Sequence, residues 1–146
     1  MTSTAVHAFG TLLKMGDGAS PEVFTTVAEM REIPVPSLEG AMIDVTTHES
    51  PGGIRESIPN LPALGDLTFD IFYKPSDATH DENTGLLRKT LDRTRVNFKV
   101  VYNISPAKVC SFAGYVTRFQ PRAPVDGVWT SAVRINVAQL PTWGAT

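Results

Sequence analysis

The stretch KVCSFAGYVTRF, residues 108–119, decides the fold class because it is apolar on both faces of an expected strand. Successive side chains of a strand point to opposite sides. The apolar residues of this stretch are Val109, Ala113 and Tyr115 on one face, and Cys110, Phe112 and Val116 on the other. Such a strand is covered twice, by its own core and by a second surface. We therefore expect a β-rich core with this strand inside it.

Period-two alternation of apolar and polar residues predicts further strands on both sides of this stretch. The expected strands cover residues 8–15, 22–33, 41–46, 54–58, 67–73, 94–103 and 128–138. Glycine, proline and asparagine separate them, and we expect turns at residues 16–18, 60–62 and 121–127. Residues 41–58 then form a hairpin whose tip is a long polar loop.

One helix is expected, over residues 79–92. Thr79 and Glu82 have the T-x-x-E spacing of a capping box. Leu87 and Leu91, with Leu86 beside them, form an apolar stripe that can pack on a sheet. Strands followed by one helix and more strands do not repeat as strand–helix–strand, which argues against a doubly wound parallel sheet. The pattern predicts a mainly β fold: an antiparallel β-sandwich or partly closed barrel with one flanking α-helix and a long hairpin loop.

Composition excludes several classes of protein. Of the 146 residues, 42% are hydrophobic and 19% are charged, as in a single globular domain. The net charge of −2 offers no broad surface for gripping nucleic acid. The single cysteine, Cys110, lies in an apolar run, so we expect it to be buried and without a disulfide partner. The N-terminus does not resemble a secretory signal, and we expect a protein made in the cytosol with no membrane segment.

The polar stretch DVTTHESPGGIRESIP, residues 44–59, has the residue types of an active site without the required spacing. His48-Glu49 begins an H-E-x-x-H pattern, but Gly52 stands where the second histidine belongs. Ser57 lacks the G-x-S-x-G elbow of an exposed nucleophile. The three histidines, His7, His48 and His80, are dispersed and are expected at the surface. We expect no catalytic residues, no metal and no cofactor.

Ordinary structural roles explain the remaining polar features. Asp44 is expected to pair with Arg55 across the hairpin, and Gly52-Gly53 to let its tip bend. Asp81 and Glu82 suit the positive end of the expected helix. The most basic region is expected to be mainly a solvated face, with a polyanion or an acidic neighbour left open as a partner, and it consists of Arg88, Lys89, Arg93, Arg95 and Lys99.

The order of these segments resembles the tail tube protein, or major tail protein, of long-tailed, siphophage-type bacteriophages. The resemblance covers about residues 8–140. Its first part is AFGTLLKMGDG (8–18), Phe24 and AEMREI (28–33). Its second part is MIDVT (42–46), THES (47–50) and IRESIPNLPALGDLTFDIFY (54–73), followed by the helix before a strand. No single motif is specific, and the order of the segments carries the resemblance.

The resemblance implies a structural virion protein rather than an enzyme. Subunits of that family form hexameric rings, and the rings stack into a hollow tube through which DNA is delivered without sequence-specific binding. It implies a flexible arm over residues 1–7 and one tail-tube domain over residues 8–146, with no further C-terminal domain. The implied partners are other copies, the tape measure, the tail terminator and the baseplate or tip. The implied location is the virion tail, assembled from protein made in the host cytoplasm.

The resemblance also places contacts between subunits and rings in the hairpin loop. The expected contact residues are Asp44, Thr47, His48, Glu49, Gly52, Gly53, Ile54, Arg55 and Glu56. We further expect polar faces of the later strands to line the lumen. Two alternatives stay open: a tube subunit of a related contractile tail or secretion apparatus, and a small β-barrel enzyme or ligand-binding module that uses Asp44, His48, Glu49 and Glu56.

Overall fold

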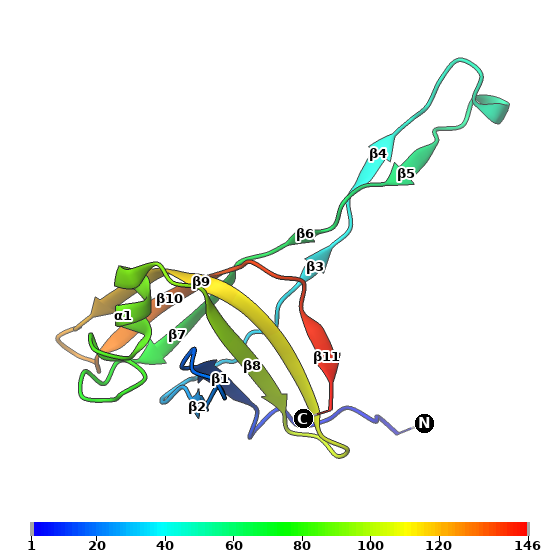
Figure 1. Cartoon of the computed structure of the whole chain (residues 1–146). Coiled ribbons are helices and arrows are strands. Elements are labelled where there is room, and N and C mark those ends of the chain that lie inside the picture. The colour runs from blue at the N-terminus through cyan, green and yellow to red at the C-terminus, as the bar shows by residue number, and fades with distance from the viewer. Residues whose placement is uncertain (1, 146) are drawn as a thin grey trace.

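The chain is built from antiparallel strands with one short α-helix, as Figure 1 shows for the computed structural model, which describes residues 2–145. The strands are β1 (Leu12–Gly16), β2 (Phe24–Thr26), β3 (Leu38–Glu39), β4 (Met42–Asp44), β5 (Ser57–Pro59), β6 (Ala63–Leu64), β7 (Leu67–Phe72), β8 (Val96–Tyr102), β9 (Lys108–Arg122), β10 (Thr130–Val137) and β11 (Thr142–Gly144). The helices are the 3-10 helix η1 (Pro51–Gly53) and α1 (Leu86–Asp92). Met1 of the expected arm and Thr146 of the expected domain lie outside the described residues.

The main sheet has the strand order β2-β1-β8-β9-β10-β7, with β11 paired to β9. Every pair in it is antiparallel. After β2 the chain crosses to the opposite edge, where Met30 bridges Ile71 of β7 and the Phe72 N–H donates to the Glu29 carbonyl. The sheet therefore curves back on itself without closing into a barrel. This confirms the expected mainly β, antiparallel class with one flanking helix.

The core lies on the concave face of this sheet, and the expected alternation selects its residues. Phe98 of β8 and Phe112 of β9 stack with ring centroids 5.5 Å apart. Cys110 is buried as expected, and burial raises the pKa of its thiol. On the second face of β9, Val109 and Ala113 are buried within the single chain, where β11 pairs with β9 and the Ala138 N–H donates to the Ala113 carbonyl. The C-terminal segment, which sequence reasoning missed, thus runs beside this part of β9.

Three expected strands have the wrong bounds. The strand expected at residues 54–58 is β5, which begins only at Ser57. The strand expected at residues 8–15 begins at Leu12, because the Thr11 N–H closes a turn onto the Ala8 carbonyl. The strand expected at residues 22–33 is cut to Phe24–Thr26. Beyond it the backbone leaves the ladder: Glu29 has a φ of 58°, and the Ala28 N–H donates to the Thr79 hydroxyl. The apolar alternation of residues 22–33 therefore belongs to a crossing segment.

The helix is shorter than expected. It begins at Leu86, and Thr79 does not cap it, because the Thr79 hydroxyl donates to Asp77 Oδ1 at 2.6 Å. Asp81 accepts from the N–H groups of three residues in the turn before the helix: Asn83, Thr84 and Gly85. The expected stripe is also wrong, since Leu86 is fully buried and Leu91 is exposed.

The expectation that His80 lies at the surface is wrong, because its side chain is fully buried. Nδ1 accepts from the Lys74 N–H at 3.2 Å, so Nε2 carries the proton that it donates to the Ala28 carbonyl at 2.8 Å. The imidazole therefore ties the loop before α1 to the crossing segment, and it serves the fold.

Candidate assembly hairpin

Residues 38–64, called the long hairpin below, leave the main sheet as an extended two-stranded arm (Figure 1). Two short ladders build it: Leu38 and Glu39 pair with Leu64 and Ala63, and Met42–Asp44 pairs with Ser57–Pro59. The Asn60 N–H donates to the Ala41 carbonyl at 2.8 Å and links the two ladders. The turn expected at residues 60–62 is therefore wrong, because this segment continues the returning arm.

The long hairpin has almost no buried side chain in the isolated chain. Ser50 is the one buried residue between positions 38 and 63. Seven large apolar side chains are exposed: Leu38, Met42, Ile43, Val45, Ile54, Ile58 and Leu61. An isolated two-stranded hairpin is marginally stable in water, and apolar surface of this extent marks a site of interaction. The long hairpin is therefore a candidate surface for contact with another molecule.

The apolar side chains are divided between the two faces of the hairpin. Directly paired residues share a face, so Ile43 and Ile58 lie on one side. Met42 and Pro59 lie on the other side, together with the Asp44–Ser57 pair. The arm can therefore be covered on both faces at once.

The tip is ordered by its own hydrogen bonds. Ser50 Oγ accepts from the Thr47 N–H at 2.9 Å and donates to Glu56 Oε2 at 2.8 Å. Thr46 Oγ1 accepts from the Glu56 N–H at 2.8 Å, and the Val45 N–H donates to the Glu56 carbonyl at 2.9 Å. Gly52 and Gly53 both have a φ of 65°, a backbone conformation that glycine adopts without steric cost. The tip thus holds one shape without support from the rest of the chain.

The expected pairing of Asp44 with Arg55 is present. Arg55 Nη1 lies 3.3 Å from Asp44 Oδ2, and both side chains are exposed. Hydrogen bonding from Thr46, first from its side chain and then from its backbone, holds the pKa of Asp44 below its ordinary value. The Thr46 N–H donates to Asp44 Oδ1 at 2.9 Å, a shorter contact than the one from Arg55, and an exposed ion pair contributes little.

The nine expected contact residues all lie in the outer half of the long hairpin, and all are exposed. Some of their side chains are bonded within the tip, and others have no partner there. Asp44, Arg55 and Glu56 have partners within the tip, and Thr47 Oγ1 accepts from the Glu49 N–H at 3.2 Å. His48, Glu49 and Ile54 have no side-chain hydrogen bond or ion pair within residues 2–145, and Ile54 is 69% exposed. Sequence reasoning missed Thr46 and Ser50, which hold the tip together.

A metal site or an active site would require histidine and acidic side chains that converge on one position. Within residues 2–145 no three histidine, cysteine, aspartate or glutamate side chains come close enough to hold a metal ion. His48, Glu49 and Glu56 are all exposed to solvent at the tip. None of the helices formed by residues 2–145 is long and apolar enough to span a membrane.

Solved structures share this fold. No protein-family model matches the chain, and no curated protein matches its sequence. The chain is similar to a protein in the tail of an empty gene transfer agent particle, refined with sixfold symmetry, at 20% identity and a TM-score of 0.74. That match covers 97% of this chain and 100% of the other.

Two further structures extend the range of tails with this fold. The SPP1 tail tube matches at 9% identity and a TM-score of 0.66, over 96% of this chain and 80% of the other. The sheath/tube terminator structure of an extracellular contractile injection system matches at 8% identity and a TM-score of 0.70, over 99% and 100% of the two chains. The chain therefore has the fold found in tail tube structures, and at these identities the likeness concerns the fold.

Proposed function

We propose that the chain is a structural virion protein that assembles into hexameric rings, which stack into the hollow tube of a phage tail. The observation that carries this proposal is the long hairpin, a preorganised arm of exposed apolar residues on a curved antiparallel sheet. The sixfold symmetry of the gene transfer agent tail supports a ring of six. We assign no enzymatic role to the chain, and its place is the virion tail.

The long hairpin is the contact between subunits and rings in this proposal. Its exposed apolar residues become buried against neighbouring copies, and His48, Glu49 and Ile54 at the tip meet the partner directly. Thr46, Ser50 and Glu56 act as positioning residues, because their side chains bond within the tip. The arm over residues 1–7 makes a second contact, with Val6 and the nearby Phe9 as exposed anchors. The single domain over residues 8–146 supplies the tube wall.

The tube passes DNA through its lumen without sequence-specific binding. Polar faces of the later strands line that lumen in this proposal, and a net charge of −2 avoids a strong hold on the polyanion. Arg134, on the exposed face of β10, is already bound to Asp66, which reduces its attraction for phosphate. The tape measure, the tail terminator and the baseplate or tip are the other partners.

A tube subunit of a contractile injection apparatus is the second candidate function. The observation that favours it is the fold shared with the sheath/tube terminator structure of such a system. The two functions differ in partners, because a contractile system requires an outer surface that a sheath covers. Co-assembly with a sheath protein would distinguish them.

Electron microscopy of the purified protein tests the proposal. We expect rings and stacked tubes as the protein concentration rises, and a matching shift to large species in sedimentation velocity. A protein that stays monomeric at high concentration, with or without other tail proteins, would refute the tube function.

A further inference from the structure

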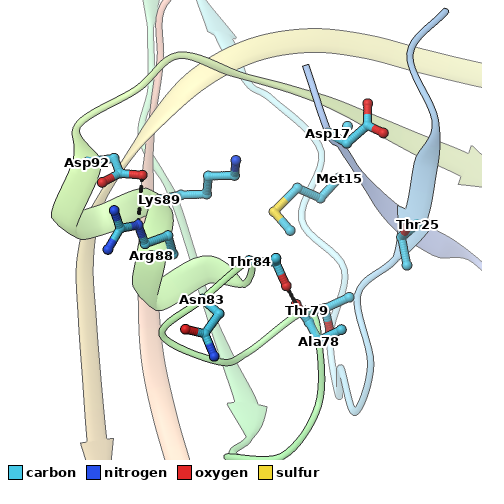
Figure 2. Close-up of a pocket in the computed structure, with 11 residues that line it drawn as sticks. Met15, Asp17, Thr25, Ala78, Thr79, Asn83, Thr84, Arg88, Lys89 and Asp92 are labelled. Carbon is cyan, nitrogen blue, oxygen red and sulfur yellow. Dashed lines mark hydrogen bonds and ion pairs between the residues drawn. The ribbon is translucent and has the colours of Figure 1, made fainter. Parts of the chain in front are cut away.

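A groove of about 270 Å³ lies between α1 and the β1–β2 turn (Figure 2). Met15 and Lys89 point into this space, called the helix groove below. Arg88 also lines it, but its Nε is bound to Asp92 Oδ2 at 3.0 Å. The helix groove therefore presents one cation, Lys89, that makes no ion pair within residues 2–145.

The acid on the far wall of the groove, Asp17, makes no ion pair with Lys89, and of the influences that lower the pKa of Asp17 the Ala19 hydrogen bond is the largest and the lysine the smallest. Asp17 Oδ1 accepts from the Ala19 N–H at 2.9 Å and the Val23 N–H at 3.1 Å, so this carboxylate is held in its own turn. Arg93, which follows the helix in a left-handed conformation with φ 56°, is exposed and also lacks an ion pair within the described chain. Lys89 and Arg93 therefore place two cations without an ion pair near the end of α1, where a carboxylate of another molecule could bind.

The tip of the long hairpin carries the complementary charge. Residues 41–60 contain three acids, Asp44, Glu49 and Glu56, against Arg55, so the net charge is −2. Asp44 and Glu56 are bound within the tip, and Glu49 is the acid there whose side chain has no partner within residues 2–145. Ile54 adds an exposed apolar side chain to the same tip.

We propose that the helix groove of one copy receives the hairpin tip of another copy, with Glu49 against Lys89 and Arg93 and with Ile54 entering the groove. This assignment rests on the tube function proposed above and names the surface that receives the hairpin. The occupant is a second copy of this chain, because the tip carries an exposed acid without a partner, Glu49, and the end of α1 carries two cations without an ion pair within residues 2–145.

The positions of the two surfaces fit a repeating contact. The helix α1 and the hairpin tip lie at opposite ends of the molecule (Figure 1). A contact between two different surfaces of identical copies is heterologous, and it generates rings or stacks instead of a closed pair. An extended arm rises about 3.3 Å per residue, so the twelve steps from Leu38 to Ser50 span roughly 40 Å. This reach is sufficient to cross an adjoining domain.

Charge reversal tests the pairing in the full-length chain. Glu49→Lys alone and Lys89→Glu alone should each raise the critical concentration for tube formation by about tenfold or more, because each places like charges in the contact. A mixture of the two single variants can form two opposite-charge contacts between positions 49 and 89, one of them normal and one reversed in both partners. The double variant Glu49→Lys/Lys89→Glu restores opposite charges between positions 49 and 89 at every contact, although Arg93 then faces a lysine. The double variant should therefore assemble at a critical concentration at least about threefold below that of either single variant.

Matched controls separate this contact from general charge effects. Asp126→Lys and Lys108→Glu reverse the charge in the same sense as Glu49→Lys and Lys89→Glu, at exposed positions outside the tip and the groove lining. They should leave assembly unchanged. Thermal unfolding of each variant below its critical concentration checks folding. If Lys89→Glu unfolds the chain, Arg93→Glu with Glu49→Lys replaces it.

The outcomes separate this pairing from the tube function. Recovery in the double variant supports the pairing. If the natural chain forms tubes while the single reversals have no effect, or while the double variant stays impaired, the pairing is overturned and the tube function stands. If the natural chain forms neither rings nor tubes, the tube function fails and the pairing fails with it.

Discussion

Replacing Ser50 by alanine tests whether the hairpin tip is preorganised by its own hydrogen bonds. Ser50 is 8% exposed although the tip around it is open to solvent. The substitution removes the hydroxyl that accepts from the Thr47 N–H at 2.9 Å and donates to Glu56 Oε2 at 2.8 Å. The backbone and the glycine turn remain as they are.

The expected magnitude follows from these two contacts. A hydrogen bond in a protein contributes about 1 kcal/mol net, so losing both weakens the ordered tip by about 2 kcal/mol. Since about 1.4 kcal/mol corresponds to a factor of ten, the fraction of chains with an open tip rises roughly 30-fold. The free energy of global unfolding should change by less than about 0.5 kcal/mol, because the tip does not pack against the core.

Hydrogen exchange measures the effect directly. Amides in the segment 46–56 should exchange faster in Ser50→Ala, and those of β8 and β9 should not. Ser57→Ala is the matched control, because Ser57 is exposed and its side chain makes no hydrogen bond within residues 2–145. The critical concentration for tube formation should rise, since only the ordered fraction is competent to bind. Unchanged exchange in the tip, or a clear fall in the temperature of global unfolding, would refute a self-supporting tip.

Three further predictions concern the core, the tip and acid stability. His80→Ala should lower the free energy of unfolding by about 3–5 kcal/mol in a denaturant titration, because it leaves a cavity where the imidazole was fully buried and removes its two part-buried hydrogen bonds to backbone groups, whereas the exposed His48→Ala should change it by less than about 0.5 kcal/mol. Replacing residues 54–56 by glycines should leave the domain folded by circular dichroism but impair tube formation, and tubes of normal length would contradict the placement of the contact. Hydrogen bonds from Thr79, its hydroxyl first, hold the pKa of Asp77 below the ordinary 3.8. The stabilisation is therefore complete above that value and is lost as the pH falls through the lower folded pKa, so Asp77→Asn should reduce stability at neutral pH and flatten its acid dependence.

The strands that the sequence predicts best are those with one buried face. In β7, Leu67, Phe69 and Ile71 are buried, as their alternation indicates. The same reasoning gives β8 and most of β10. Residues 27–33 also alternate, yet they cross between sheet edges, because their backbone groups bond to Thr79 and His80, 51 and 52 residues further along the chain. A local pattern does not contain such distant partners.

The helix start shows how local signals compete. Thr79 and Glu82 have the spacing of a capping box, but Asp77 lies two residues before Thr79 and accepts from both its N–H and its hydroxyl. Gly85 also passes so close to the preceding turn that a Cβ there would lie 2.3 Å from the Asp81 nitrogen. The chain therefore remains a turn until Leu86. A capping motif predicts a helix only where no nearer acceptor takes its hydroxyl.

The sequence predicts that the candidate site is a hairpin, but it does not predict the hydrogen bonds that order the hairpin tip. The Asp44–Arg55 pair and the two glycines are visible in the sequence, and both have the expected roles. Ser50 has no distinguishing neighbour in the sequence, because its burial arises when the tip folds over it. Glu56 shows the reverse: it was expected to be a contact residue, and the structure binds its carboxylate to Ser50. A charged side chain that is already bonded within the tip is less available to a partner, and the sequence does not show which side chains these are.

The separation of core and hairpin has a consequence for assembly. The two ladders of the long hairpin contain five residue pairs, too few to hold a two-stranded arm by themselves. Its order in the isolated chain therefore depends on the tip network, and under the proposed function its apolar residues contribute free energy when another copy covers them. Substitutions in the tip should consequently change the concentration at which tubes form while the domain stays folded. Substitutions at His80 or in the sheet should lower the stability of the domain first and impair assembly through the loss of folded subunits.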